Sequence, residues 1–184
     1  DFRTTNYQVF DAIANWDVSN VVNMDWMFYG NEYFNTNLDN WNVNNCKDFT
    51  LMFEGCEFYN QPMNSWNINT SDEVKMHGMF KNAKNFNKNL SNWNVSSVTT
   101  MYEMFRYADD FNDGMPSYYT SADNSIALWD VSSCRNFSMM FYDTNINIDL
   151  STWCVEDAPF PYGFATLSPL DEDFSRWPNF GDPC

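Results

Sequence analysis

The side chains that could do chemistry are few in this sequence and do not form a catalytic pattern. The chain has one histidine, His77, and five cysteines, with no Cys-x-x-Cys pair among them. Zinc sites need several such ligands at short spacing, and the sequence contains neither a phosphate-binding glycine loop nor a nucleophile elbow. The stretch 171–173 is rich in carboxylates but does not have the spacing of a calcium loop. We therefore predict a protein that is not an enzyme and that holds no cofactor or metal.

Acidic side chains are abundant, yet they recur in no pattern of paired acids that would indicate glycoside hydrolysis. We interpret Asp109, Asp110 and Asp113 as solvated loop charges. The net charge of the 184 residues is −16, which would repel nucleic acid and anionic membranes. No segment approaches the roughly 18 apolar residues of a membrane span. The chain opens at Asp1 without a leader, which indicates a processed protein or an excised piece.

Internal repeats dominate the sequence. Tryptophans recur at spacings of 25, 25, 27, 36 and 24 residues, and the first five are followed by Asp or Asn and then by Val or Ile. Each unit continues with an apolar pair, a Phe and one later apolar residue. The tryptophans are Trp16, Trp41, Trp66, Trp93, Trp129 and Trp153, and the later apolar positions are Phe34, Phe58, Phe86, Phe111 and Ile146. Agreement among five units predicts stacked copies of one structural unit.

The spacing inside one unit predicts its parts. In Leu38-x-x-Trp41-x-Val43 the apolar residues alternate with Asn, which is the period of a strand with one buried face. In Met24-x-x-Met27-Phe28 the spacing of three and four favours one helical turn. We therefore expect an α/β solenoid in a single domain, with about five stacked repeats, each made of a short parallel strand and a short helical turn.

The domain boundaries follow from the repeats. We expect the repeats to occupy residues 1–153, with units starting near each of the first five tryptophans, and a loop-rich cap to occupy residues 154–184. The unit that starts at Trp66 is longer by two residues around 70–75, and the next unit is longer by about eleven, at 113–124. A solenoid tolerates such insertions as loops on one face, and these loops are either neutral or functional.

The segment 86–105 has the pattern Phe-Asn-x-x-Leu-Ser-Asn-Trp-Asn-Val-Ser-Ser-Val-Thr-Thr-Met-x-x-Met-Phe and resembles the repeat of the BspA-like leucine-rich-repeat surface proteins. The resemblance covers about residues 9–154, although Phe49 and Phe137 replace the usual Met. It implies a fold of the leucine-rich-repeat type, a place on the cell surface or outside the cell, and a role in adhesion or protein binding. It carries no shared catalytic residues.

The cysteines divide by repeat position. Cys46, Cys56 and Cys134 stand where other units have Val or Ala, so we expect buried free thiols. Cys154 and Cys184 fit no repeat position, and we predict a disulfide between them that closes the cap. A Cys46–Cys56 bridge is the alternative. Four Asn-x-Ser/Thr sequons are candidate N-glycosylation sites in a host that glycosylates them: Asn69, Asn89, Asn94 and Asn136.

Polar side chains recur on the expected outward face of the strands and form columns along the stack. We define the polar face as Asn15, Asp17, Asn40, Asn42, Asn44, Asn67, Asn92, Asn94 and Asp130. In a parallel stack these side chains would repeat about every 5 Å. They form either an amide ladder, in which each side chain bonds its neighbours above and below, or a binding strip, and the two roles are compatible.

These observations lead to a ranked set of functions. The first hypothesis is an extracellular or cell-surface module for binding or adhesion, whose partner is a protein or a carbohydrate. The alternative is a structural building block that binds copies of itself in a surface layer, appendage or filament. Ice binding is a remote third, because regular ice-binding faces usually present Thr, whereas these columns are Asn, Asp and Ser.

Overall fold

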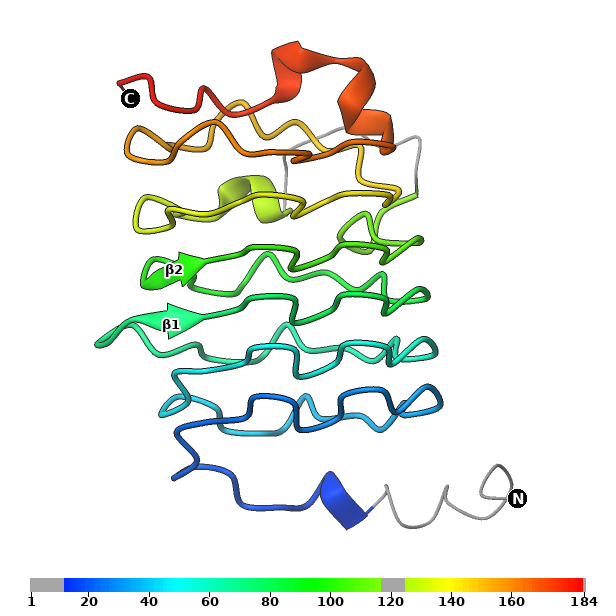
Figure 1. The fold of residues 1–184 in the computed structure, drawn as a ribbon. Coiled ribbons are helices and arrows are strands. Elements are labelled where there is room, and N and C mark those ends of the chain that lie inside the picture. The colour runs from blue at the N-terminus through cyan, green and yellow to red at the C-terminus, as the bar shows by residue number, and fades with distance from the viewer. Residues whose placement is uncertain (1–11, 117–124, 184) are drawn as a thin grey trace.

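The computed structural model describes residues 12–116 and 125–183, which form a stack of irregular coils (Figure 1). Coil 1 lies at one end of the stack and the C-terminal segment lies at the other. The coils comprise residues 13–37, 38–62, 63–89, 90–125 and 126–149, and the cap comprises residues 150–183. Residues 1–11 of the expected repeat region, 117–124 of the long insertion, and 184 lie outside the described residues.

Regular secondary structure is sparse. Strands β1 (Val74–Lys75) and β2 (Val98–Thr100) pair in parallel, with Val74 opposite Val98 and an irregularity after Val74. Single parallel bridges extend this pairing to other coils and join Asn23 to Asp48, Asp48 to Lys75, and Thr100 to Asn136. The 3₁₀ helices are η1 (Ile126–Leu128), η2 (Pro169–Glu172) and η3 (Phe174–Arg176), and the last two lie in the cap.

The predicted α/β solenoid of leucine-rich-repeat type is wrong. The described part of the chain is mostly loops, its two short strands lie in coils 3 and 4, and none of its residues from 16 onward is α-helical. The segment around Trp41 and Val43 is no strand, because it lies between two turns, closed by bonds from the Trp41 N–H to the Leu38 oxygen and from the Cys46 N–H to the Val43 oxygen. These turn bonds use main-chain N–H and C=O groups that a strand would need for a hydrogen-bond ladder to the neighbouring coils.

The Met-x-x-Met-Phe segments form turns instead of helical turns. In coil 1 the Met27 N–H bonds to the Met24 oxygen three residues back, and Trp26 between them has a φ of +58°. A positive φ at the third residue is the signature of a type II turn and ends a right-handed helix. The N–H groups of Trp26 and Phe28 bond across to coil 2, at 3.0 and 2.9 Å. The same positive φ recurs in the other coils and the cap, at Leu51, Gly78, Glu103, Met139 and Gly163.

Most of the predicted core positions are confirmed, but Trp16, which is 53% exposed, and Phe58 are exceptions. Leu38, Trp41 and Phe53 are at most 4% exposed, and equivalent residues of successive coils stack on one another. Ring centroids of neighbouring tryptophans from Trp41 to Trp153 lie 6.0–6.5 Å apart. Phe58, predicted to be buried, is 45% exposed, and Tyr59 takes its place in the core, between Phe34 and Phe86. The core is therefore a set of aromatic columns along the stack.

Candidate functional site

All nine residues of the polar face are exposed. Their neighbours in sequence alternate with them, so that Trp41 and Val43 are buried on either side of Asn42. The prediction of an outward polar surface over a buried row is thus confirmed, even though no strand carries it. The side chains stand on coils whose positions are set by the packed aromatic core.

The predicted amide ladder does not run along the polar face. The Oδ1 atoms of Asp17, Asn42, Asn94 and Asp130 each accept the N–H two residues ahead, at 3.0–3.2 Å, and so close local turns. Among the nine residues of this face, all of which the structure describes, one bond between side chains of neighbouring coils is present, from Asn67 Nδ2 to Asn44 Oδ1 at 3.3 Å. Because the local turns use one acceptor atom each, the remaining donors and lone pairs face solvent.

An asparagine ladder lies elsewhere, directly after the late apolar residue of each unit. Asn35 Oδ1 accepts the N–H of Asn60, Asn60 that of Asn87, Asn87 that of Asn112, and Asn112 that of Asn147, at 2.9–3.0 Å. The ladder ends at Arg176 of the cap, whose guanidinium donates to Asn147 Oδ1. Sequence reasoning missed this column, although an Asn after the apolar residue in five successive units was a usable signal.

A polar groove lies beside β1 and β2, next to the edge of the polar face. It has a volume of about 640 Å³ and spans coils 3, 4 and 5. We call it the hydroxyl groove, and its lining residues are Thr70, Ser71, Asp72, Glu73, Ser96, Ser97, Thr99, Ser133 and Arg135. The first four lie in the stretch 70–75, where the sequence indicated a gain of two residues. Sequence reasoning found the insertion but not the groove, because the other walls come from coils 4 and 5.

A partly buried charge network lies on the turn segments of coils 2 to 4. Glu103 is 4% exposed and bonds Lys81 at 2.7 Å and Arg106, while Lys81 also lies 3.8 Å from Glu54. Burial alone would raise the pKa of Glu103, but the hydrogen bonds from Lys81 and Arg106 bring it below its ordinary value. The Arg106 guanidinium also lies over the rings of neighbouring tyrosines. The charges of this network pair with one another, and the ion pairs of Lys81 join coil 3 to coils 2 and 4.

Asp113 is not the solvated loop charge that the sequence indicated. It is fully buried at the start of the long insertion, and its two oxygens accept the N–H groups of Leu90 at 2.6 Å and Ile126 at 2.8 Å. Burial raises the pKa of Asp113 to about 7, although these two hydrogen bonds act in the opposite direction. The side chain joins the two ends of the insertion to the core.

An acidic groove near the cap offers no metal site. It is lined by Asp109, Asp143, Asp171 and Glu172 among others. No group of three or more His, Cys, Asp or Glu side chains that could hold a metal ion occurs in residues 12–116 and 125–183. His77 is half-buried, its ring meets Tyr102 edge to face at 4.8 Å, and burial lowers its pKa.

The cysteines are placed as the repeat positions predicted. Cys46, Cys56 and Cys134 are buried and free, so the alternative Cys46–Cys56 bridge is wrong. Burial raises the pKa values of these thiols to about 11, 12 and 11. Cys154 is disulfide-bonded. Its predicted partner, Cys184, lies outside the described residues, so the pairing stays a prediction.

The four sequons differ in exposure. Asn94 and Asn136 are exposed, whereas Asn69 is 7% exposed. Asn89 is half-buried, and its side chain bonds Asn64 and Ser91. Among these candidates, only Asn94 and Asn136 present an amide that a glycan could occupy without loss of buried bonds. A glycan on Asn94 would stand on the polar face.

Comparison with known protein families gives a match over most of the chain. The family model described as "Mycoplasma protein of unknown function, DUF285" matches residues 2–75 and 115–179. No curated protein and no solved structure matches the chain. Within the described ranges, no helix is long and apolar enough to cross a membrane.

Proposed function

We propose that this chain, which belongs to the DUF285 family of Mycoplasma-type proteins of unknown function, is a non-catalytic module for binding or adhesion outside the cell or at its surface. The DUF285 family is associated with BspA-like surface repeat proteins, and the resemblance of segment 86–105 to their repeat supports that location. The leucine-rich-repeat architecture that the resemblance implied is not carried over.

The observation that carries the proposal is the exposure of the whole polar face. All nine of its residues stand in solvent on coils held by a continuous core. Polar groups on a rigid support lose little conformational entropy on binding. The amides supply donors and acceptors together, so the face suits a partner with both, such as a protein backbone or a carbohydrate.

Arrays of extracellular proteins and of glycans test the proposal, with the full chain as the probe. The informative variant is Asn42→Ala with Asn67→Ala, because both side chains are exposed and on neighbouring coils. We expect binding to fall at least tenfold, while the midpoint of thermal unfolding falls only slightly because the two hydrogen bonds that are lost are exposed to solvent. Asn85→Ala, exposed but on another part of coil 3, is the control. Absence of any bound protein or glycan would contradict the proposal.

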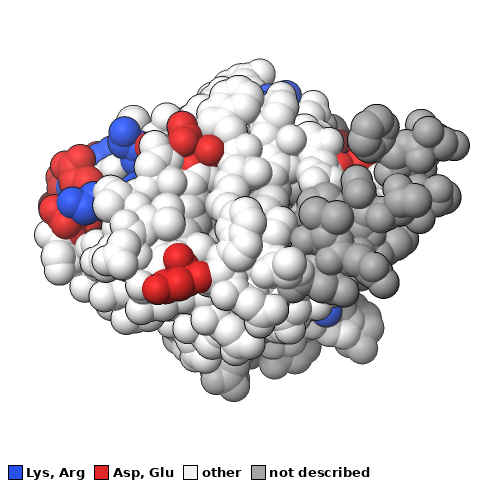
Figure 2. All heavy atoms as spheres, turned by 90° about the horizontal axis from the view of Figure 1, so that it is seen from below, with Lys and Arg blue, Asp and Glu red and all other residues white. Residues whose placement is uncertain are grey.

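A self-assembling building block is a second candidate, supported by the surface of coil 1. Trp16 is 53% exposed, while the equivalent tryptophans from Trp41 to Trp153 are at most 5% exposed. Val22, Trp26 and Tyr29 of the same coil are also about half exposed. Seen from this end of the stack, much of the visible surface is uncharged (Figure 2). Light scattering across a range of concentrations separates a monomeric binder from an assembling unit, and Trp16→Ser with Trp26→Ser would dissolve an assembly built on this end.

A further inference from the structure

We propose that the hydroxyl groove binds a neutral, polyhydroxylated ligand, namely one or two residues of an uncharged carbohydrate chain. The inference rests on the proposed binding function and names the ligand class and the place where it is held. It draws on three features of the groove: its unused hydroxyl groups, its internally paired charges, and the ridge that forms one wall.

The first feature is a surplus of hydroxyl groups. The side chains of Thr70, Ser71, Ser96 and Ser133 make no hydrogen bond within the described part of the chain, so each offers one donor and two lone pairs. Ser97 Oγ donates to the Asn69 oxygen at 2.5 Å and thus keeps its lone pairs for a ligand. A sugar hydroxyl also has one donor and two lone pairs, so the hydroxyl groups of the groove can both donate hydrogen bonds to it and accept them from it.

The second feature is that the charges in the groove are mostly paired. Asp72 bonds Lys47 at 2.9 Å, and Arg135 bonds Asp157 at 3.0 Å. The Arg135 guanidinium also donates to the Ser132 oxygen. Glu73 has no ion pair within the described residues, so the remaining local charge is negative. Together with the net charge of −16, this disfavours phosphate, sulfate and carboxylate ligands.

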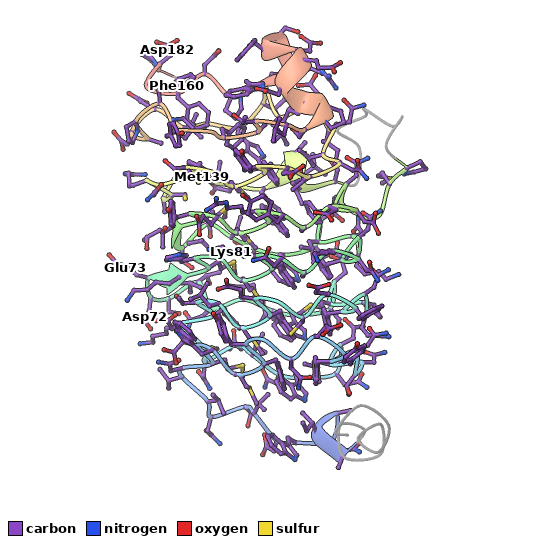
Figure 3. The ribbon with its side chains drawn as sticks, turned by 45° about the vertical axis from the view of Figure 1, so that its right-hand side comes forward. Asp72, Glu73, Lys81, Met139, Phe160 and Asp182 are labelled. Carbon is purple, nitrogen blue, oxygen red and sulfur yellow. The ribbon has the colours of Figure 1, made fainter. Side chains whose placement is uncertain are left out.

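The third feature is the ridge made by the insertion in coil 3. Asp72 and Glu73 stand at the outer edge of the molecule beside β1 (Figure 3). Asn69 Oδ1 accepts the N–H groups of Ser71 at 2.8 Å and Asp72 at 3.2 Å, which holds the ridge in a turn. The wall is therefore formed before a ligand arrives, and less ordering entropy is lost on binding. The volume of the hydroxyl groove, about 640 Å³, lies in the range of small-ligand sites.

An open polar groove without a stacking ring predicts weak binding at a single site. Sugar hydroxyls exchange bonds with water for bonds with protein, and each exchange raises the affinity only roughly two- to twelvefold. A module displayed in many copies would gain strength through multivalency, by on the order of a hundredfold or more. Because many immobilised copies bind together more strongly than one, glycan arrays and surface-binding assays with immobilised protein are suitable for detecting this interaction.

The test uses the full chain on an array of neutral oligosaccharides of glucose, mannose and galactose, with sialylated and sulfated oligosaccharides alongside. Affinity for the strongest neutral probe is then measured for Ser71→Ala with Ser96→Ala. We expect about a tenfold loss from the two missing hydroxyls. The matched control is Ser19→Ala, at the position of coil 1 equivalent to Ser96, which should stay within about twofold of the parent chain. Thermal unfolding verifies that all variants are folded.

The outcomes separate this inference from the function on which it rests. Binding of a neutral probe that the Ser71/Ser96 variant loses and the Ser19 variant keeps supports the groove. Neutral binding that survives in the groove variant but is lost in Asn42→Ala with Asn67→Ala overturns the groove and leaves the binding function standing. Capture of proteins or acidic glycans alone has the same consequence. A chain that binds neither proteins nor glycans overturns both.

Discussion

The indole N–H of Trp66 donates a hydrogen bond to the main-chain oxygen of Leu38, 2.9 Å away in the preceding coil. The same bond joins each later coil to the one before it, and it runs from Trp93 to Met63, from Trp129 to Leu90 and from Trp153 to Ile126. Each of these tryptophans therefore fills the core and also gives a second hydrogen bond to a carbonyl oxygen that already closes a turn in the preceding coil. This double role explains why the recurring residue is Trp rather than Phe.

Replacing Trp66 by Phe tests how much this hydrogen bond contributes to the free energy of unfolding. Phe keeps an aromatic ring in the column but removes one of the two donors to the Leu38 oxygen, which still accepts the Trp41 N–H. We therefore expect the free energy of unfolding to fall by about 1 kcal/mol, the net contribution of one hydrogen bond. Urea denaturation followed by fluorescence or circular dichroism measures the change. Trp16→Phe, at a position 53% exposed, should change stability by less than about 0.5 kcal/mol. Equal effects at both positions would show that the indole bond does not stabilise the stack.

The asparagine ladder gives a second prediction. Asn87 Oδ1 accepts two main-chain N–H groups, from Asn112 at 2.9 Å and Gly114 at 2.7 Å. Asn87→Ala leaves both donors without this partner, and we expect a loss of about 1–3 kcal/mol in unfolding free energy. Asn85→Ala, two residues away and exposed, is the matched control and should be nearly neutral. If the Asn85 variant lost as much stability as the Asn87 variant, the ladder would have no special role.

Asp113 predicts a particular dependence of stability on pH. Its pKa in the folded chain is about 7, above the value of 3.8 for an exposed Asp, because burial disfavours the charged form. The folded state therefore holds the proton more tightly than the unfolded state. The contribution of this group is fully present below about pH 4 and is lost as the pH rises toward 7, by at most about 4 kcal/mol.

Asp113→Asn tests this dependence. The amide cannot titrate, and it offers one oxygen to the two N–H groups of Leu90 and Ile126. We expect the variant to be less stable at pH 4 and the difference from the parent chain to shrink between pH 4 and 7. Urea unfolding at a series of pH values provides the measurement. Parallel stability curves for the two chains would mean that Asp113 does not titrate in this range.

The buried thiols should be unreactive in the folded chain. Burial raises the pKa values of Cys46, Cys56 and Cys134 to about 11, 12 and 11, so little thiolate exists at pH 8. We expect a thiol reagent such as 5,5′-dithiobis(2-nitrobenzoate) to label none of the three under native conditions and all three in urea. Peptide mapping of the unreduced chain also tests the predicted Cys154–Cys184 bond. Rapid native labelling of Cys46 would place that side chain outside the core.

The sequence predicted the repeat and its core but not the backbone that carries them. The apolar residues Leu38, Trp41 and Phe53 are buried as expected. A spacing of three, however, fits a type II turn as well as a helical turn, and hydrophobic periodicity does not report the sign of φ. Leu51 and Glu103 adopt φ of +55° at the decisive position, where neither residue type signals it. Gly78 at the same position was the available hint.

The candidate site was predicted in part for a similar reason. Exposure of Asn42 and Asn94 follows from the alternation of polar and apolar residues, which one unit contains in full. The hydroxyl groove depends on how Ser71, Ser96 and Ser133 meet across three coils, and no single unit contains that information. The same holds for Asp113, whose burial depends on Leu90 and Ile126 on either side of an insertion.

The most direct test of the binding function is a map of amide chemical shifts when the strongest array probe, protein or glycan, is added to the ¹⁵N-labelled chain. A binding module that uses the polar face should show shifts that gather at residues 40–44, 67–73 and 92–99 and spare the asparagine ladder on the other part of each coil. Shifts confined to Asn35, Asn60 and Asn87, or to the cap, would contradict the proposed binding surface.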